Sequence, residues 1–562
     1  MLSSQALKRL ALSRWGALSL VVAPILLLWG EVQRLGVNTL FADELYYVDF
    51  IRLVRQGGDW TPWIWLQHNE HRVIPMKLVM ALLAGPTHWS QRAEMFCSVV
   101  LSALIVLVLW LVYRSSGAAS EPSDLLAFAP LAWLVCSLSQ YESQLYGMMM
   151  CHFMTALAAV LALWLLARGG RVSVMLAVLT AVLGAFSIAN GFLIFPAGIA
   201  VLAGRRAGWG RWAAWCLGGT AALAFYLRDY IVPPHTQPFQ WTLGGAYKVA
   251  KLGFATMGAP LAAGSLAWGV SLGAGLLAVS AFFGLRWLRA EPESRRRDAL
   301  AIALLLFGLA SCAMVAFGRA FLNDRPLLPR YITYTNLAWT GVYLLVLAQT
   351  RSGRYPTWRT VAWSLLVPGL LAADLQGLSE ARLWRKERLL DQYSLQTLPL
   401  QPDAVVSRQF GTPDTIRRAA SYLSAERLSA YAEPQRIVMP MDVATAQPTE
   451  EILRGQAVEQ RLVCPVAELY DVGVMVQPAA RPGGSFTVAV TSGGRELARR
   501  SFETASLRGS TWVQVPLAKP LARCAGRDLV VRVESADASP GTGVRVLASG
   551  PALNAFRFGV LP

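Results

Sequence analysis

The 562-residue sequence is far more apolar than that of a water-soluble protein, with 55% hydrophobic and only 15% charged residues and a mean hydropathy of +0.42. Soluble domains carry about 25% charged residues. Long apolar runs recur along most of the chain, so the composition argues against a soluble enzyme and predicts a polytopic α-helical membrane protein. The net charge of +17 does not indicate nucleic-acid binding, because the basic residues fall largely in short loops between apolar runs.

The first predicted membrane span, residues 15–33, follows Lys8, Arg9 and Arg14. Its apolar run is too long for a cleaved signal peptide and further apolar runs follow, so we expect a retained signal anchor. Each span needs about 20 apolar residues, and shorter or tilted segments are tolerated. The eleven predicted spans are residues 15–33, 95–113, 123–139, 148–167, 172–188, 190–204, 210–227, 262–285, 299–319, 333–349 and 359–376.

The distribution of basic residues predicts the orientation of these spans. With a cytoplasmic N-terminus, every predicted inner loop carries arginine, whereas the short outer loop 140–147 contains neither Lys nor Arg. This agreement with the positive-inside rule requires that residues 73–85 do not cross. That run is short and contains Lys77, so we interpret it as interfacial or re-entrant. Residues 34–94 then form one large outer loop, and the chain beyond residue 376 also lies outside.

The large outer loop begins with the acidic sequence "FADELYYVDF", residues 41–50. Residues 44–56 have the apolar spacing of an amphipathic helix on the membrane surface. The tryptophan-rich segment 59–67 that follows suits the headgroup level. We therefore expect two surface helices that frame the polar segment "QHNEHR", residues 67–72.

Four motifs, "FADELYYVDF", "HNEHRVIP", "SQYESQLYG" and "LPRYITY", resemble those of a group of bacterial membrane glycosyltransferases. The arrangement of a first span, a large acidic outer loop and many further spans is similar to the GT-C superfamily, over roughly residues 1–380. The resemblance implies a polyprenyl-phosphate-linked sugar as donor, an outer-face glycan, lipid or protein as acceptor, and an Asp or Glu of the first loop as catalytic base.

The carboxylates of that loop suit this chemistry. Glycosyl transfer with inversion needs a base that takes the proton of the acceptor hydroxyl, and a carboxylate fills that role. Asp43 and Glu44 are the candidate catalytic residues. Adjacent residues on a helix point about 100° apart, so only one of the two is expected to face the acceptor, and we favour Asp43. The alternative is that both carboxylates, with Asp49, only cap and balance the helix that follows.

The segment "QHNEHR" supplies four further candidates for substrate binding: His68, Glu70, His71 and Arg72. Arg72 would contact phosphate, and Glu70 or His71 would contact sugar hydroxyls. The alternatives are a solvated turn or a metal site. The spacing of His68 and His71 is not that of a known zinc motif. A divalent cation held by Asp43, Glu44 and His71 is left open.

Two later outer loops carry the remaining candidates. Glu142 lies at a membrane edge, where charge is costly and tends to be functional, and Arg72 is the partner that we expect for it. The segment "GRAFLNDRPLLPRY" places arginine on the side where arginine is depleted. Guanidinium binds phosphate oxygens in a bidentate way, so this segment predicts a phosphate clamp, with snorkelling to lipid headgroups as the alternative. Its members are Arg319, Arg325, Arg330 and Tyr331.

After the last span the chain changes character. Residues 377–433 read as polar helices that link the transmembrane domain, residues 1–376, to residues 434–562. The last segment alternates apolar and polar residues between turn-forming residues, which predicts a β-sandwich. It contains Cys464 and Cys524, the two cysteines outside the spans, for which we expect a periplasmic disulfide. Alanine- and arginine-rich usage favours a GC-rich bacterium, so the predicted location is a bacterial inner membrane with the β domain in the periplasm.

A second class of function stays open at this stage: a transporter or lipid flippase, or an assembly factor for surface polysaccharide, without enzymatic activity. A transporter needs ionisable residues in mid-membrane, and the predicted spans contain almost none. The sugar, the acceptor and the stereochemistry of transfer are not specified by the sequence.

Overall fold

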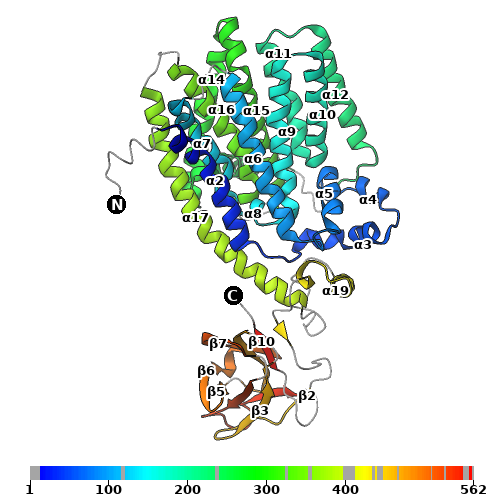
Figure 1. Ribbon diagram of the computed structural model, residues 1–562, viewed down its shortest axis with the longest axis vertical. Helices are drawn as coiled ribbons and strands as arrows, with labels where there is room; N and C mark the ends of the chain where they lie inside the picture. The colour runs from blue at the N-terminus through cyan, green and yellow to red at the C-terminus, as the bar shows by residue number, and fades with distance from the viewer. Residues whose placement is uncertain are drawn as a thin grey trace. The chain divides into compact units, whose positions relative to one another are not determined.

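The computed structural model comprises two units, Met1–Leu389 and Leu390–Pro562 (Figure 1). The first is helical, and the second contains all the strands that the structure describes. The structure describes residues 13–115, 121–234, 239–322, 327–351, 357–396, 412–432, 437–438, 447–464, 468–481, 483–507, 509–524, 527–548 and 556–559.

Long helices form the body of the first unit, and every one of the eleven predicted spans coincides with one of them. One further helix, α13, lies between the predicted spans 210–227 and 262–285, where two lysines and four glycines interrupt its apolar pattern. The helices are α2 (Arg14–Leu35), α6 (Gln91–Ser115), α7 (Pro122–Cys136), α9 (Met150–Arg168), α10 (Arg171–Ser187), α11 (Ile194–Gly204), α12 (Trp209–Leu227), α13 (Leu243–Gly258), α14 (Leu266–Arg289), α15 (Pro292–Arg319), α16 (Ile332–Arg351) and α17 (Thr357–Gln396).

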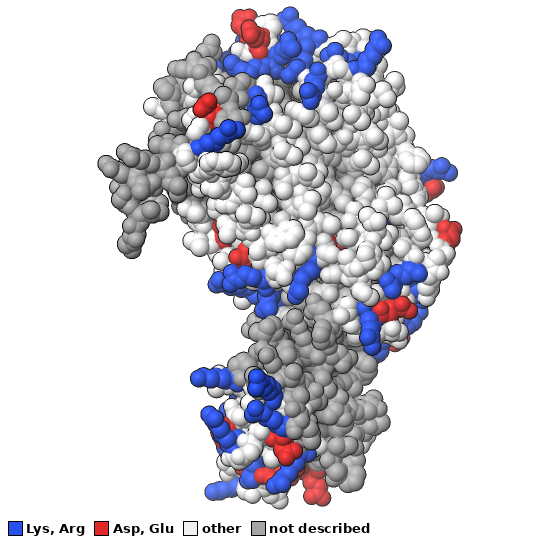
Figure 2. All heavy atoms as spheres, in the orientation of Figure 1, with Lys and Arg blue, Asp and Glu red and all other residues white. Residues whose placement is uncertain are grey.

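Within the described part of the chain, seven helical segments are long and apolar enough to cross a membrane. Figure 2 shows a broad band with few charged side chains between two charged ends of this unit. The prediction of a multi-pass helical membrane protein is therefore confirmed. Crossing by α10, α11, α12 and α16, which are also helices, stays a prediction. The seven segments are α2, α6, Pro122–Gln144, Gly147–Arg168, α14, α15 and Val361–Leu389.

Short elements connect the long helices, and most of them lie at one end of the bundle. The apolar run predicted not to cross is α5, whose 11 residues extend only about 16 Å, half of a hydrocarbon core. Its Lys77 is buried, and the ammonium group donates to the carbonyls of Ile64 and Leu66. These elements are η1 (Ala42–Tyr47), α3 (Val48–Gln56), α4 (Thr61–Trp65), α5 (Ile74–Ala84), η2 (Leu138–Gln140), α8 (Tyr141–Gln144), η3 (Gly147–Met149), η4 (Ala189–Leu193), η5 (Ala259–Leu261) and η6 (Pro329–Tyr331).

The apolar stripe of the first loop faces protein rather than lipid, which corrects our expectation of a helix on the membrane surface. Tyr47, Phe50 and Ile51 are fully buried, and the Phe50 ring packs near the rings of Trp60 and Trp63. The apolar spacing does mark one face of the segment, but that face packs against the helical unit and not against lipid.

The second unit begins inside α17, because this helix continues without a break past residue 376 to Gln396. The predicted boundary at residue 376 therefore lies within a helix. Two short helical elements, α19 (Pro413–Ala425) and η8 (Ser429–Tyr431), precede the strands. Helix α19 has one apolar face, on which Ile416 and Leu423 are buried.

The strands of the second unit form two antiparallel sheets in the part that the structure describes. One sheet has the order β1-β10-β4-β9-β2, with β7 also paired to β4, and the other has the order β3-β8-β5-β6. Alternate valines of both sheets fill the core, as expected for a β-sandwich. The strands are β1 (Ile437–Val438), β2 (Gln447–Pro448), β3 (Ala457–Val463), β4 (Glu468–Pro478), β5 (Ser485–Ser492), β6 (Arg495–Glu503), β7 (Thr511–Ala522), β8 (Asp528–Glu534), β9 (Val544–Ala548) and β10 (Phe556–Gly559).

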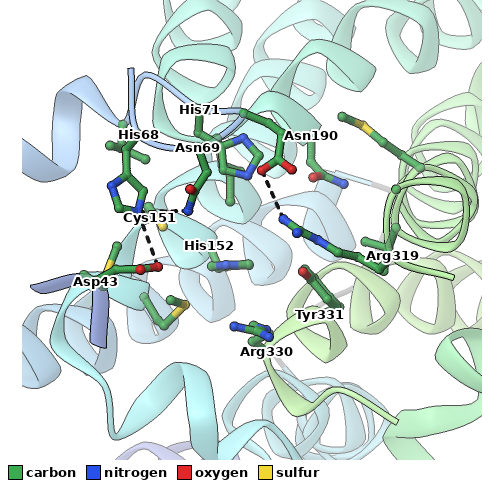
Figure 3. A pocket seen from close by; sticks show the side chains of 18 residues that line it. Asp43, His68, Asn69, His71, Cys151, His152, Asn190, Arg319, Arg330 and Tyr331 are labelled. Carbon is green, nitrogen blue, oxygen red and sulfur yellow. Dashed lines mark hydrogen bonds and ion pairs between the residues drawn. The ribbon is translucent and has the colours of Figure 1, made fainter. Parts of the chain in front are cut away.

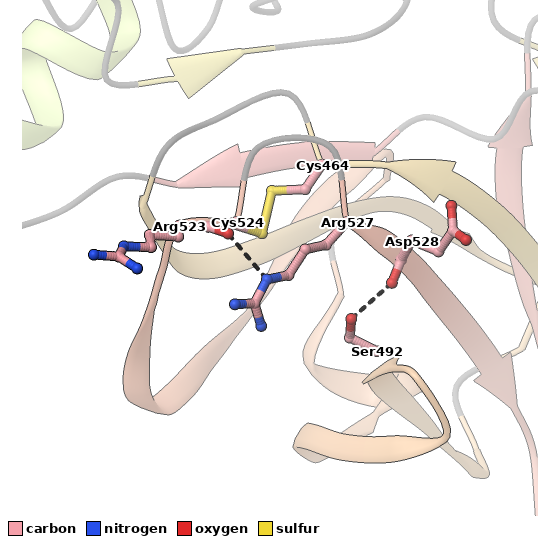
Figure 4. The surroundings of a disulfide bond; sticks show 6 residues. All are labelled: Cys464, Ser492, Arg523, Cys524, Arg527 and Asp528. Carbon is pink, nitrogen blue, oxygen red and sulfur yellow. Dashed lines mark hydrogen bonds between the residues drawn. A yellow bond between two sulfur atoms is a disulfide. The ribbon is translucent and has the colours of Figure 1, made fainter.

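Cys464 and Cys524 form a disulfide with a Cα–Cα distance of 5.8 Å (Figure 4). Cys464 follows β3 in one sheet and Cys524 follows β7 in the other, so the bond links the two sheets. Close to the disulfide, Nε of Arg527 donates to the carbonyl of Arg523 at 2.9 Å. The disulfide thus holds one end of the sandwich together.

Candidate active site

A cavity of about 150 Å³ lies at the end of the helical unit where the short elements gather (Figure 3). The segments around it are the loop after α2, the turn before α5, the start of α9, the α10–α11 connection, the end of α15 and the turn before α16. Seven predicted site residues line it: Asp43, His68, Glu70, His71, Arg319, Arg330 and Tyr331. Asn69, Cys151, His152 and Asn190 also line it.

The two adjacent carboxylates of the first loop point to different places. Asp43 lines the cavity, and its Oδ2 lies 3.4 Å from Nε2 of His68 (Figure 3). Glu44 is fully buried away from the cavity, where its carboxylate accepts from the backbone N–H groups of Phe41 at 3.0 Å and Met148 at 3.2 Å. Glu44 therefore caps the 3₁₀ turn η1, which matches the capping alternative of the sequence, and only Asp43 faces the candidate site.

Aromatic and charged side chains contact the loop that carries Asp43, next to Phe41. The hydroxyl of Tyr146 donates to the carbonyl of Phe41 at 2.9 Å. The guanidinium of Arg388, on α17, stacks 3.4 Å from the centre of the Phe41 ring and 4.3 Å from that of Trp384. Cation–π contacts of a buried arginine restrict the backbone next to Asp43, so α17 positions the candidate base.

Residues 68–71 form a tight hairpin turn. The N–H and C=O groups of His68 and His71 bond to each other at 2.6 and 2.8 Å. Such a pair places both side chains on one face, and both imidazoles line the cavity. Asn69 at the tip has φ +49°, a conformation that asparagine tolerates better than most residues. The polar segment is therefore an ordered hairpin turn that places the side chains of His68 and His71 along the cavity.

Glu70 and Arg319 join this turn to α15. The Arg319 guanidinium donates to Oε2 of Glu70 at 3.2 Å (Figure 3). Both side chains are about one quarter exposed, so the pair is partly desolvated. Arg319 keeps further N–H donors beside the cavity, because one carboxylate oxygen uses only part of a guanidinium.

Arg330 lies on η6, directly before α16, and its Nη1 is 3.7 Å from Oε1 of Glu142. The partner that we expected for Glu142, Arg72, is therefore wrong. The hydroxyl of Ser143 donates to the backbone carbonyl of Arg330 at 3.1 Å, which fixes the arginine against α8. Arg325, the third predicted member of the clamp, lies outside the described residues.

Arg72 does not reach the cavity, although the sequence placed it among the substrate-binding residues. It is buried, and its guanidinium donates to the backbone carbonyls of Tyr226, Trp65 and Arg228. The guanidinium also stacks 4.2 Å from the centre of the Trp65 ring. The side chain turns toward α12 because three carbonyls at the end of that helix and of α4 would otherwise be unsatisfied.

Two buried polar residues of the cavity were missed by the sequence analysis. His152 is 3% exposed and Asn190 is 5% exposed. In the part of the chain that the structure describes, Nδ1 of His152, Nδ2 of Asn190 and Nε of Arg330 have no hydrogen-bond partner. Buried polar atoms in native proteins are normally paired, and these three belong to residues that line one cavity, although other unpaired atoms occur elsewhere in the described chain.

Burial and nearby charges shift the pKa values of two cavity residues that lie outside the spans, Asp43 and His71. Burial alone would raise the pKa of Asp43, but the hydrogen bond and charge of His68, with the charges of Arg330 and Arg319, hold that pKa below its usual value. Burial lowers the pKa of His71, and its Nδ1 accepts from the N–H of Ala189 at 3.3 Å. At neutral pH the site therefore contains an ionised Asp43 and a neutral His71 that presents Nε2–H.

A metal site of the kind left open by the sequence does not form from the residues proposed for it. Glu44 turns away from Asp43 and His71, as described above. Among the described residues, no group of three or more His, Cys, Asp and Glu side chains is placed to hold a metal ion. The positive charge that lines the cavity comes from arginine.

The fold and site define a multi-pass membrane protein with a soluble β domain and a polar cavity where several of its helices begin or end. No model of a protein family matches the sequence, and no curated protein is similar to it. Among solved structures, the chain is similar to the arabinosyltransferase EmbB from Mycobacterium smegmatis, with a TM-score of 0.40 and 13% identity. That similarity covers 98% of this chain and 67% of the other.

Proposed function

We propose that this protein is a membrane glycosyltransferase of the GT-C type. In this proposal a polyprenyl-phosphate-linked sugar is the donor, and a glycan, lipid or protein at the outer membrane face is the acceptor. The observation that carries the proposal is the meeting of Asp43 with Arg319 and Arg330 in one cavity, at the end of the helical unit. A lipid-linked donor stays in the bilayer, so its phosphate would meet the protein at such a boundary.

The reaction assigns different tasks to the two charges. Asp43 accepts the proton of the acceptor hydroxyl while that oxygen forms a bond to the anomeric carbon. The bond from the anomeric carbon to the phosphate oxygen breaks, and its electron pair leaves with the polyprenyl phosphate. Arg330 and Arg319 stabilise the negative charge that develops on this leaving group, because guanidinium donors match phosphate oxygens.

The lowered pKa of Asp43 is consistent with this role, because the carboxylate is available as a proton acceptor at neutral pH. The unpartnered polar atoms of His152 and Asn190 supply hydrogen bonds to sugar hydroxyls on the opposite wall. Carbohydrate recognition depends on such groups, since each unpaired hydroxyl or amide in a buried site costs about 1–3 kcal/mol.

The orientation that this proposal requires places the cavity on the periplasmic side of a bacterial inner membrane. It rests on the arginine-rich loops at the other end of the spans. β-sandwich domains often bind carbohydrate, which would suit a glycan acceptor, and a purely packing role of the domain is the alternative. That part of the proposal rests on fold analogy alone.

The experiment that tests the proposal is the comparison of cell-envelope glycans from cells with the gene, without it and with the Asp43→Asn variant. The proposal expects one sugar residue to be missing from the same glycan in the deletion strain and in the variant. A deletion that leaves every glycan unchanged, or a variant that restores full glycosylation, would contradict it. A transporter would also alter glycans in the deletion strain, but it does not require a carboxylate at this position.

A further inference from the structure

A second cavity, of about 510 Å³, lies far from the candidate active site. It is formed by the end of α14, the start of α15 and the last turns of α16. Cavities of several hundred Å³ accommodate small molecules or headgroups. Nothing in the proposed transfer reaction uses it.

The length of α15 separates the two cavities by about the thickness of a membrane. Asp298 lines the second cavity and Gly318 lines the first, on the same helix. Twenty residues of α-helix rise about 30 Å, which equals the hydrocarbon core of a bilayer. The second cavity therefore opens at the opposite membrane face, where Figure 2 shows Lys and Arg side chains gathered on the visible surface.

Three arginines give the second cavity its charge: Arg286, Arg289 and Arg297. The guanidinium of Arg286 donates to Oε1 of Gln349 on α16, and Nε of Arg297 donates to Oδ1 of Asp298 at 2.8 Å. These bonds, with a second one from Nη2 of Arg297 to Oδ2 of Asp298 at 3.3 Å, fix two guanidinium groups in place beside the cavity. Because Glu291 is the other acid besides Asp298, the lining is net positive.

The same cavity is apolar on its membrane side. Phe282 and Leu285 line it from α14, and their side chains are 47% and 53% exposed. On a helix that is apolar enough to cross a membrane, exposed residues of this type face acyl chains. The cavity therefore adjoins both a cluster of guanidinium groups and the lipid phase, as a site for an anionic amphiphile does.

We propose that this cavity binds the headgroup of an anionic phospholipid. The phosphodiester contacts Arg286, Arg289 and Arg297, and the acyl chains lie along Phe282 and Leu285 of α14. A lipid fits this cavity better than free phosphate does, because the apolar side chains of Phe282 and Leu285 line it together with the guanidinium groups.

The test uses the full-length protein in phosphatidylcholine vesicles with and without phosphatidylglycerol, and native mass spectrometry to count retained phosphatidylglycerol. Arg289 is exposed, so Arg289→Glu removes charge from the cavity with little effect on folding. Arg171→Glu is the matched control, because Arg171 is exposed at the same end of the helical unit but does not line the cavity. We expect about tenfold weaker retention for Arg289→Glu and no change for Arg171→Glu.

A second variant tests the cavity itself without a change of charge. Ser294 lines it, and Ser294→Phe would fill part of the space. The proposal expects phosphatidylglycerol retention to fall in this variant while the thermal unfolding temperature in pure phosphatidylcholine stays the same. Equal loss in Arg171→Glu, full retention in Ser294→Phe, no retained lipid in the unsubstituted protein, or displacement of the lipid by inorganic phosphate would each overturn it.

Discussion

Glu70 and Arg319 form an ion pair of 3.2 Å although 249 residues separate them in the chain. The pair joins the hairpin after the first span to the end of α15, and Arg330 and Glu142 make a similar connection between η6 and α8. Each arginine of the cavity is thus held by one carboxylate and keeps donors for a ligand. The proposed phosphate site is preorganised by these two pairs.

Substitution of Arg330 by glutamine should weaken the binding of polyprenyl phosphate by about 10–100-fold, because hydrogen bonds to charged groups contribute about 1.5–3 kcal/mol. Ligand-induced shifts of the unfolding temperature measure this binding. The double variant Arg330→Gln/Glu142→Gln should bind equally weakly but unfold at a higher temperature than Arg330→Gln alone, since no unpaired Glu142 remains. Restored binding in the double variant would show that Arg330 only neutralises Glu142.

The loss of transfer activity at acidic pH should report the protonation of Asp43. A carboxyl with a lowered pKa is ionised above that pKa, so activity is lost only as the pH falls through a value below the usual range for aspartate. In His68→Gln the charge of His68 is removed, the pKa of Asp43 rises, and the acidic limb moves to higher pH. Rates measured across pH in membranes containing each protein check this shift. An unchanged limb in His68→Gln would argue against Asp43 as the titrating group.

Glu44 should affect stability rather than catalysis. Burial raises its pKa, so the folded state favours the protonated form more than the unfolded state does. The contribution of Glu44 to stability is therefore fully present below the pKa that Glu44 has in the unfolded chain. It is lost as the pH rises through the higher pKa that Glu44 has in the folded protein. We expect Glu44→Gln to retain transfer and to be more stable than the unsubstituted protein at alkaline pH but not in acid. Thermal unfolding at several pH values checks this, and loss of transfer in a folded Glu44→Gln protein would contradict it.

Arg72 should also be structural. Its removal leaves buried carbonyls of α4 and α12 unsatisfied, and Arg72→Gln should lower the free energy of unfolding by about 2–4 kcal/mol. Arg228→Gln is the matched control, because that side chain is 71% exposed and its backbone carbonyl stays in place. Chemical denaturation in detergent measures the difference. Equal stability of the two variants would show that the carbonyl contacts of Arg72 contribute little.

Much of the helical fold could be predicted because a bilayer imposes a length and an apolar composition on each span. α13 was missed, since its glycines and lysines break the apolar run that hydropathy detects. The apolar face of α3 was recognised, but periodicity alone does not distinguish lipid from protein as the partner of that face. The surface that covers it comes from tryptophans in the following segment.

The charged residues of the candidate site could be predicted from the sequence, but the ion pairs that they form could not. Charge at a membrane edge is conspicuous in a sequence, which is why Asp43 and Arg330 were found. Pairing depends on side-chain direction, so Arg72 was assigned to Glu142 although Arg330 fills that place. His152 and Asn190 gave weaker signals: a lone histidine at the start of a span, and an asparagine followed by Gly191, a pair that is typical of a tight turn.

The most direct measurement compares the transfer activity of Asp43→Asn with that of Asp49→Asn. Both change one carboxylate of the same loop, but Asp49 is 62% exposed, pairs with Arg52 at 3.0 Å and does not line the cavity. The account predicts that Asp43→Asn folds normally and loses about 10²–10⁴-fold in rate, whereas Asp49→Asn retains full activity. Equal activity of the two variants would contradict the assignment of Asp43 as the catalytic base.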